Sequence, residues 1–248
     1  MVLGRFPSPV IELAPEAKGI VEKFTPIAQA IRKGDLVAFK RSLGPDSGNE
    51  RWFFQKGLFL PLLSRCEVLV WRSLFRRIFM LTFQFPYDPA SRRMPTVDLI
   101  DVVAAAQHCQ KVLEGWQKPS MNALFVPSTD LERPPGGVKR LVAQQGTIFG
   151  NKMPNLLEIE AISASLIQQG LLRGYVIHNL SKYAIIGSKA RGGPLNAGFP
   201  NVWQTLKERA DSDGRSEEVP GWVKNEKKRR IGGVVNLSGI ARPVGSGG

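Results

Sequence analysis

The feature that most constrains the fold is a run of apolar residues between positions 50 and 81 that recurs every three or four residues. This spacing is typical of helices that bury one face in a core. Its members are Phe54, Leu58, Leu62, Val68, Trp71, Phe75 and Phe79. The phase changes between Pro61 and Cys66, and proline interrupts the hydrogen bonding of a helix. The pattern therefore predicts two stacked helices, over residues 50–60 and 62–81.

Helical patterns also lie on both sides of this run. Apolar residues between Val21 and Leu43 predict two short helices, because Gly34 and Asp35 divide the segment and act as turn residues. Thr96 is the expected N-cap of a further helix. That helix is expected to end between positions 110 and 115, with an apolar stripe of Val97, Ile100, Val103 and Ala104. The first part of the chain is therefore expected to be mainly α, built of stacked helical hairpins.

A different pattern follows residue 154. Asn155 or Pro154 is expected to begin a helix that Gly170 ends, with a positive φ at this glycine. Strands are then predicted over 171–177 and 183–186, joined by a turn. Gly174 would let the first strand pass close to a helix. Two helices followed by a small β-hairpin indicate a winged-helix subdomain.

These patterns suggest three regions along the chain. Residues 1–95 form the helical-repeat part, 96–190 the winged-helix subdomain, and 191–248 a basic extension rich in glycine and proline. A long insert at about 115–153 interrupts the second region. Such a long, weakly periodic segment is expected to be functional or mobile.

The charge balance predicts anionic partners, because 34 lysines and arginines oppose 21 acidic residues and give a net charge of +13. Arg72 and Arg76 share one helix face, which is either solvated or functional. Trp203 and Trp222 either stack on unpaired bases or dock the C-terminal extension. The candidate nucleic-acid-binding residues are Arg173, Lys182, Lys189 and Arg191 around the hairpin, and Lys224, Lys227, Lys228, Arg229 and Arg230 in the extension.

Residues that would support catalysis are sparse. The chain has two histidines, His108 and His178, and two cysteines, Cys66 and Cys109, without the paired spacing of a zinc site. The two cysteines cannot form a disulfide framework, which favours a reducing compartment. We therefore expect no enzyme activity, no catalytic residues, no metal and no cofactor.

Four segments together resemble the PCI family of winged-helix scaffold subunits. They are residues 1–8, residues 27–36 with Phe39, residues 71–78, and residues 158–161 continuing through 166–176. The likeness is strongest to the PCI subunit of the transcription–export (TREX-type) complex and to its relative associated with the COP9 signalosome. Because family members carry helical repeats before the first of these segments, the chain is expected to be the C-terminal half of a longer protein.

The resemblance implies a non-enzymatic scaffold in nuclear, transcription-coupled mRNA export, located partly at nuclear pores. Its implied partners are a larger PCI scaffold subunit, a small acidic peptide of the Sem/DSS type, and RNA, with DNA a further candidate. The candidate interface is Tyr183, Ile185 and Ile186, with Ile185 and Ile186 on opposite faces of their strand. Two alternatives remain: a signalosome-associated subunit acting in elongation or splicing, and a DNA-binding winged-helix regulator.

Overall fold

The computed structural model describes residues 17–84, 94–117 and 131–212. The chain divides into two compact units, residues 1–205 and 206–248. The first unit is mostly helical with one small sheet, which confirms the expected fold class. No helix in the described segments is long and apolar enough to span a bilayer.

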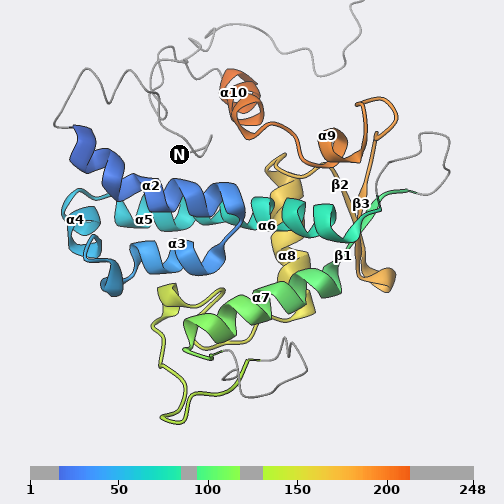
Figure 1. Cartoon of the computed structure of the whole chain (residues 1–248). Helices are drawn as coiled ribbons and strands as arrows, with labels where there is room; N and C mark the ends of the chain where they lie inside the picture. Colours follow the sequence, from blue (N-terminus) through green and yellow to red (C-terminus); the bar gives the residue numbers. More distant parts are fainter. Residues whose placement is uncertain (1–16, 85–93, 118–130, 213–248) are drawn as a thin grey trace, which may run out of the picture. The chain divides into compact units, whose positions relative to one another are not determined.

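A helical hairpin begins the described part of the chain (Figure 1). It consists of α2 (Ala17–Lys33) and α3 (Leu36–Leu43). Asp35 is the N-cap of α3, where its side chain accepts a 2.9 Å hydrogen bond from the backbone N–H of Ala38. Gly34 has a φ of +68°, and a Cβ there would lie 2.5 Å from the backbone nitrogen of Leu74. The expected turn at Gly34 is therefore confirmed, and this glycine also lets the turn pack directly on another helix.

The strongly periodic segment forms a bent series of helices. It contains α4 (Glu50–Gln55), α5 (Phe59–Pro61), a π-helical turn (Leu62–Cys66) and α6 (Glu67–Thr82). The change of apolar phase in the sequence thus coincides with Pro61 and the π-turn, as expected from the periodicity. A partly buried ion pair joins α3 to the start of α6, with Lys40 Nζ 2.7 Å from Glu67 Oε2.

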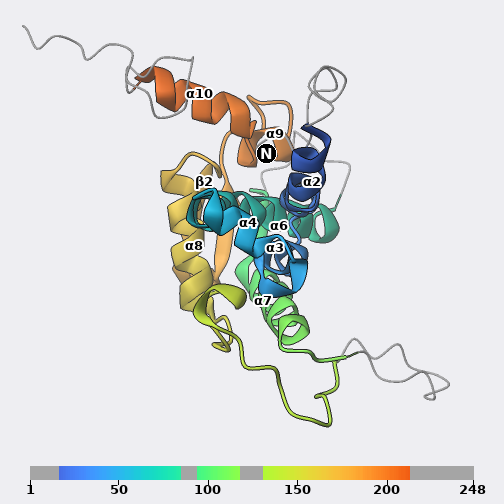
Figure 2. The ribbon, with the colours of Figure 1, turned by 90° about the vertical axis from the view of Figure 1, so that its left-hand side faces the viewer.

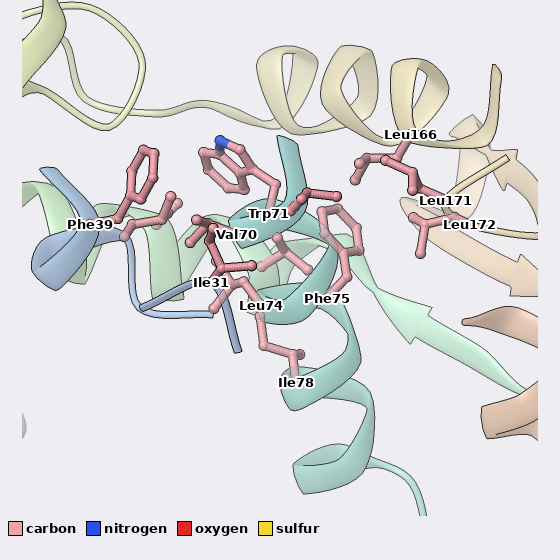
Figure 3. Packing of buried hydrophobic residues seen from close by; sticks show 14 of the residues in the cluster. Ile31, Phe39, Val70, Trp71, Leu74, Phe75, Ile78, Leu166, Leu171 and Leu172 are labelled. Carbon is pink, nitrogen blue, oxygen red and sulfur yellow. The ribbon is translucent and has the colours of Figure 1, made fainter. Parts of the chain in front are cut away.

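Helix α6 is the centre of the core. It packs against α2 and α3 as well as against α7 (Leu99–Leu113) and α8 (Leu156–Gln168) (Figures 1 and 2). Figure 3 shows Val70 and Leu74 directed toward Ile31 and Phe39, while Phe75 faces Leu171 and Leu172. One helix therefore joins the helical hairpin and the sheet-bearing part into one core.

The sheet has three antiparallel strands in the order β1-β3-β2. These are β1 (Thr96–Asp98), β2 (Gly174–Ile177) and β3 (Lys182–Ile185). The order α6-β1-α7-α8-β2-β3 is that of a winged helix, with the β2–β3 hairpin as its wing. Two short helices, α9 (Pro194–Gly198) and α10 (Val202–Ser212), follow the wing.

Three local details differ from the sequence-based expectation. Thr96 does not cap α7, because it belongs to β1 and Asp98 is the N-cap instead. The apolar stripe shifts accordingly: Ile100 is exposed, and the buried residues of α7 are Leu99, Val102, Ala106, Gln110 and Leu113. Gly174 accommodates the neighbouring strand rather than a helix, since a Cβ added there would clash with the carbonyl oxygen of Ala184.

Polar contacts attach the described part of the insert, residues 131–153, to α7. The buried Gln110 side chain donates to Gly150 O at 2.9 Å and accepts from the backbone N–H and the hydroxyl of Thr147, both at 2.8 Å.

The next helix, α8, begins at a capping box between Asn155 and Glu158, and Gly170 follows it with a φ of +71°, as expected.

Candidate partner and nucleic-acid surfaces

The outer face of the β2–β3 hairpin carries exposed apolar side chains. Tyr175 is 43% exposed and Ile186, which follows β3, is 53% exposed. Tyr175 lies opposite Ala184 in the register, so alternation places Tyr175, Lys182 and Ile186 on one face. We call this surface, with Arg173 just before β2, the wing face: Arg173, Tyr175, Lys182 and Ile186.

The opposite face of the hairpin belongs to the core. Tyr183 and Ile185 are almost completely buried, and the Tyr183 hydroxyl donates to Gly198 O at 3.3 Å. Burial raises the pKa of Tyr183 above its usual range. Of the three residues predicted at a partner interface, Ile186 is therefore the one whose side chain lies on the surface of this chain. The interface itself remains a prediction.

The structure separates the basic residues predicted around the hairpin into two places. Lys189 and Arg191 are exposed in the loop after β3, near the end where half-buried Arg173 enters β2. The Arg191 backbone N–H donates to Gly187 O at 3.2 Å within this loop. Lys182 lies at the other end of β3, opposite Asp98 on β1. Lys224, Lys227, Lys228, Arg229, Arg230 and Trp222 lie outside the described residues.

A second surface is a groove of about 770 Å³ between α2, α6 and the start of α10. We call it the basic groove because five of its lining residues are cationic and none is acidic. The cations are Arg32, Lys33, Arg72, Arg76 and Arg77, and the other lining residues are Ile31, Leu69, Ser73, Met80, Asn201, Val202 and Trp203.

Helical geometry and two packing contacts build this groove. The lining residues of α6 lie at positions 69, 72, 73, 76, 77 and 80, which is one face of a helix. Arg32 and Lys33 occupy the last turn of α2, where the close contact of Gly34 with α6 fixes the end of that helix. The third wall is held by Arg72, whose Nη2 donates to Phe199 O at 3.2 Å and to Pro200 O at 2.6 Å.

Arg72 carries a charge that is only partly compensated. Its Nε is buried and has no hydrogen-bond partner among the described residues. Burial, together with the nearby positive charge of Arg76, lowers the pKa of Arg72 to about 10. The guanidinium thus remains protonated at neutral pH.

The sequence placed Arg72 and Arg76 on one face, and both do line the groove. It did not associate them with Arg32, Lys33 or Trp203, which are 39 to 131 positions away and reach the groove through tertiary packing. Basic residues at the end of a helix are common because they complement the helix dipole, so Arg32 and Lys33 gave no distinctive signal.

The described segments contain two thiols, Cys66 and Cys109, and two histidines, His108 and His178. Burial raises the pKa of both thiols, that of Cys109 to about 11, so they are protonated at neutral pH. His178 is exposed, and its Nδ1 lies 3.0 Å from Glu160 Oε2. The described residues contain no cluster of three or more potential metal ligands.

The helix that would read DNA in a winged-helix regulator offers Gln168 for base contacts, but its charged side chains are acidic. Helix α8 contains no lysine or arginine. Glu158 pairs with Lys152, and Glu160 pairs with His178. The exposed side of α8 includes Leu157, which is 74% exposed. Insertion of this helix into a groove of DNA would bring carboxylates toward phosphates, which is unfavourable.

The chain is similar to a known protein of fission yeast. The chain is 28% identical over 184 residues, 72% of its length, to a PCI domain-containing protein of Schizosaccharomyces pombe. The match covers 29% of that protein. No protein-family model matches the chain. The similarity supports the resemblance to the PCI family that the four sequence segments indicated.

Proposed function

We propose that the chain is a PCI-type, non-enzymatic scaffold subunit that pairs with a second, larger PCI protein through the wing face. The observation that carries this proposal is the winged-helix order of elements joined to a helical hairpin, in a chain similar to a PCI domain-containing protein. Exposed Tyr175 and Ile186 supply the apolar contact that such a pairing requires.

The proposed setting is a nuclear, transcription-coupled mRNA export complex, located partly at nuclear pores. Support comes from the resemblance of the sequence to the TREX-type subunit and from the net charge of +13, which suits association with RNA. The other proposed partner is a small acidic peptide of the Sem/DSS type. The nucleic-acid contacts proposed on the wing side are Arg173, Lys182, Lys189 and Arg191, with the basic run at 224–230 as a further candidate.

Capture of partners from nuclear extract, followed by mass spectrometry, tests this proposal. The full chain is expected to retain a larger PCI protein together with export and pore components. The variant Ile186→Asp is expected to lose that PCI protein, because the carboxylate would be buried in an apolar interface. Leu60→Asp is the matched control, since Leu60 is 65% exposed on α5, which packs on α4 and the π-helical turn.

The outcomes separate the candidate functions. Recovery of signalosome subunits in place of export components would identify the signalosome-associated function. Equal recovery of the PCI protein by Ile186→Asp and by the control would rule out the wing face as the interface.

A further inference from the structure

We propose that the basic groove is a binding site for single-stranded nucleic acid, in which the cations hold phosphates and Trp203 stacks on an unpaired base. The site is distinct from the wing face. It extends the nucleic-acid part of the proposed function, and its test requires no partner subunit, so the two proposals can fail separately.

The positive charge of the groove is not balanced by nearby acidic groups. Arg32, Lys33, Arg76 and Arg77 form no ion pair within the described segments, and no lining residue is acidic. Arg72 and Arg76 lie four residues apart on α6, where like charges repel. An anion in the groove would convert this repulsion into attraction, and a phosphate backbone would supply several negative charges along its length.

The groove is pre-organised by hydrogen bonds within the protein. The two carbonyl groups of Phe199 and Pro200 fix the Arg72 guanidinium, so its charge is held in place before any ligand arrives. The N-terminal turn of α10 is fixed as well, because Asn201 Oδ1 accepts a 3.0 Å hydrogen bond from the backbone N–H of Trp203. A ligand therefore encounters an ordered site.

Trp203 presents an exposed indole in the groove. This side chain is 58% exposed and lines the same groove as the five cations. A positively charged groove with an aromatic platform is the usual arrangement for binding single strands, because phosphates bind the cations while unpaired bases stack. An acidic peptide would satisfy the cations but would make no comparable use of the indole. The aromatic group therefore favours a single-stranded nucleic acid as the occupant.

Fluorescence anisotropy of the full chain with a labelled 12-nucleotide oligouridine, at several salt concentrations, tests the proposal. For a single strand, the logarithm of the binding constant falls by about 0.7 per log unit of salt for each phosphate contact. Arg76→Ala/Arg77→Ala removes two cations and should therefore reduce this slope by about 1.4. Arg51→Ala/Lys56→Ala is the matched control, because it removes two exposed cations of the α4 region that do not line the groove. Its slope should be unchanged.

Substitution of Trp203 tests the stacking contact separately. Trp203→Ala should weaken oligouridine binding about tenfold, whereas Trp203→Phe should retain most of the affinity because phenylalanine also stacks. A labelled 20-residue polyglutamate serves as the acidic-peptide probe. An unchanged slope in Arg76→Ala/Arg77→Ala, or equal affinity in Trp203→Ala, would overturn the proposal. Tighter binding of polyglutamate than of oligouridine, lost in Arg76→Ala/Arg77→Ala, would assign the groove to acidic peptides and would likewise overturn it.

Discussion

The wing face and the basic groove belong to the same compact unit but are made in different ways. The wing face consists of neighbouring residues on one hairpin, with Tyr175 and Ile186 exposed beside two cations. The basic groove draws its five cations from α2 and α6 and its exposed aromatic residue from α10. The difference indicates that an exposed apolar surface can be encoded locally, whereas this cationic surface exists only in the packed fold.

The largest loss of stability is expected at Gly34, whose packing on α6 fixes the end of α2 beside the groove. Gly34→Ala should lower the free energy of unfolding by about 3 kcal/mol or more, because it adds a strained positive φ and a clash with the backbone of Leu74. Gly57→Ala is the control, since Gly57 has a φ of +64° but no atom within 4 Å of an added Cβ. It should lower the free energy of unfolding by about 1 kcal/mol. Urea denaturation measures the free energy of unfolding of both variants. Equal losses would mean that the packing of Gly34 on α6 does not contribute to stability.

A second glycine should affect the wing while leaving the groove formed. Gly174→Ala places a Cβ against the carbonyl oxygen of Ala184, so β2 must move away from β3. This shift should lower the free energy of unfolding by about 2 kcal/mol or more. Gly19→Ala, in an open position of α2, should be neutral or slightly stabilising. Thermal unfolding compares the two, and hydrogen exchange should show lost protection in β2 and β3. Unchanged protection there would contradict the packing described for the wing.

Arg72 links the third wall of the groove to α6. Arg72→Met should destabilise the fold by about 1.5 kcal/mol, because the carbonyl groups of Phe199 and Pro200 lose a charged donor. Arg76→Met, also on the groove side of α6 but without such hydrogen bonds, should change stability by less than about 0.5 kcal/mol. Denaturant midpoints provide the measurement, and a neutral Arg72→Met would show that the wall is held by other contacts.

The smallest effect concerns Cys109, whose pKa of about 11 is raised by burial and by Asp35 and lowered by Arg77. Alkylation of Cys109 in a Cys66→Ser background should be slow at pH 8 and should accelerate as the pH approaches 11, because the thiolate is the reactive form. Arg77→Ala should raise the pKa further and slow the reaction, since a nearby cation stabilises the thiolate. Arg51→Ala should leave the pH profile unchanged, and an equal shift in both variants would contradict a specific effect of Arg77.

The sequence predicted the features that depend on local pattern. The phase change over 61–66 and the positive φ of Gly170 correspond to the structure. The expected break at Pro61 was wrong, because the helical run is broken at 56–58 and continues through Pro61, and Phe54 is 53% exposed while Phe53 is buried. Strand β1 was missed because three residues are too short for a recognisable alternation, and this omission moved the expected N-cap from Asp98 to Thr96.

The surfaces were predicted less completely than the fold. Alternation along β3 was sufficient to expect Ile185 and Ile186 on opposite faces, and the structure has one buried and the other exposed. Arg32 and Trp203 could not be associated from spacing, because their proximity depends on how Gly34 packs on α6 and how Arg72 holds residues 199 and 200.

The central claim is that the two surfaces bind different partners, and one reciprocal binding measurement tests it most directly. Full-length Ile186→Asp and Arg76→Ala/Arg77→Ala proteins would each be titrated with labelled oligouridine and with the PCI protein recovered from nuclear extract. Ile186→Asp is expected to lose the PCI protein and keep the oligonucleotide. Arg76→Ala/Arg77→Ala is expected to show the reverse. Loss of both ligands in either correctly folded variant would contradict the account, because it would mean that the two surfaces do not act separately.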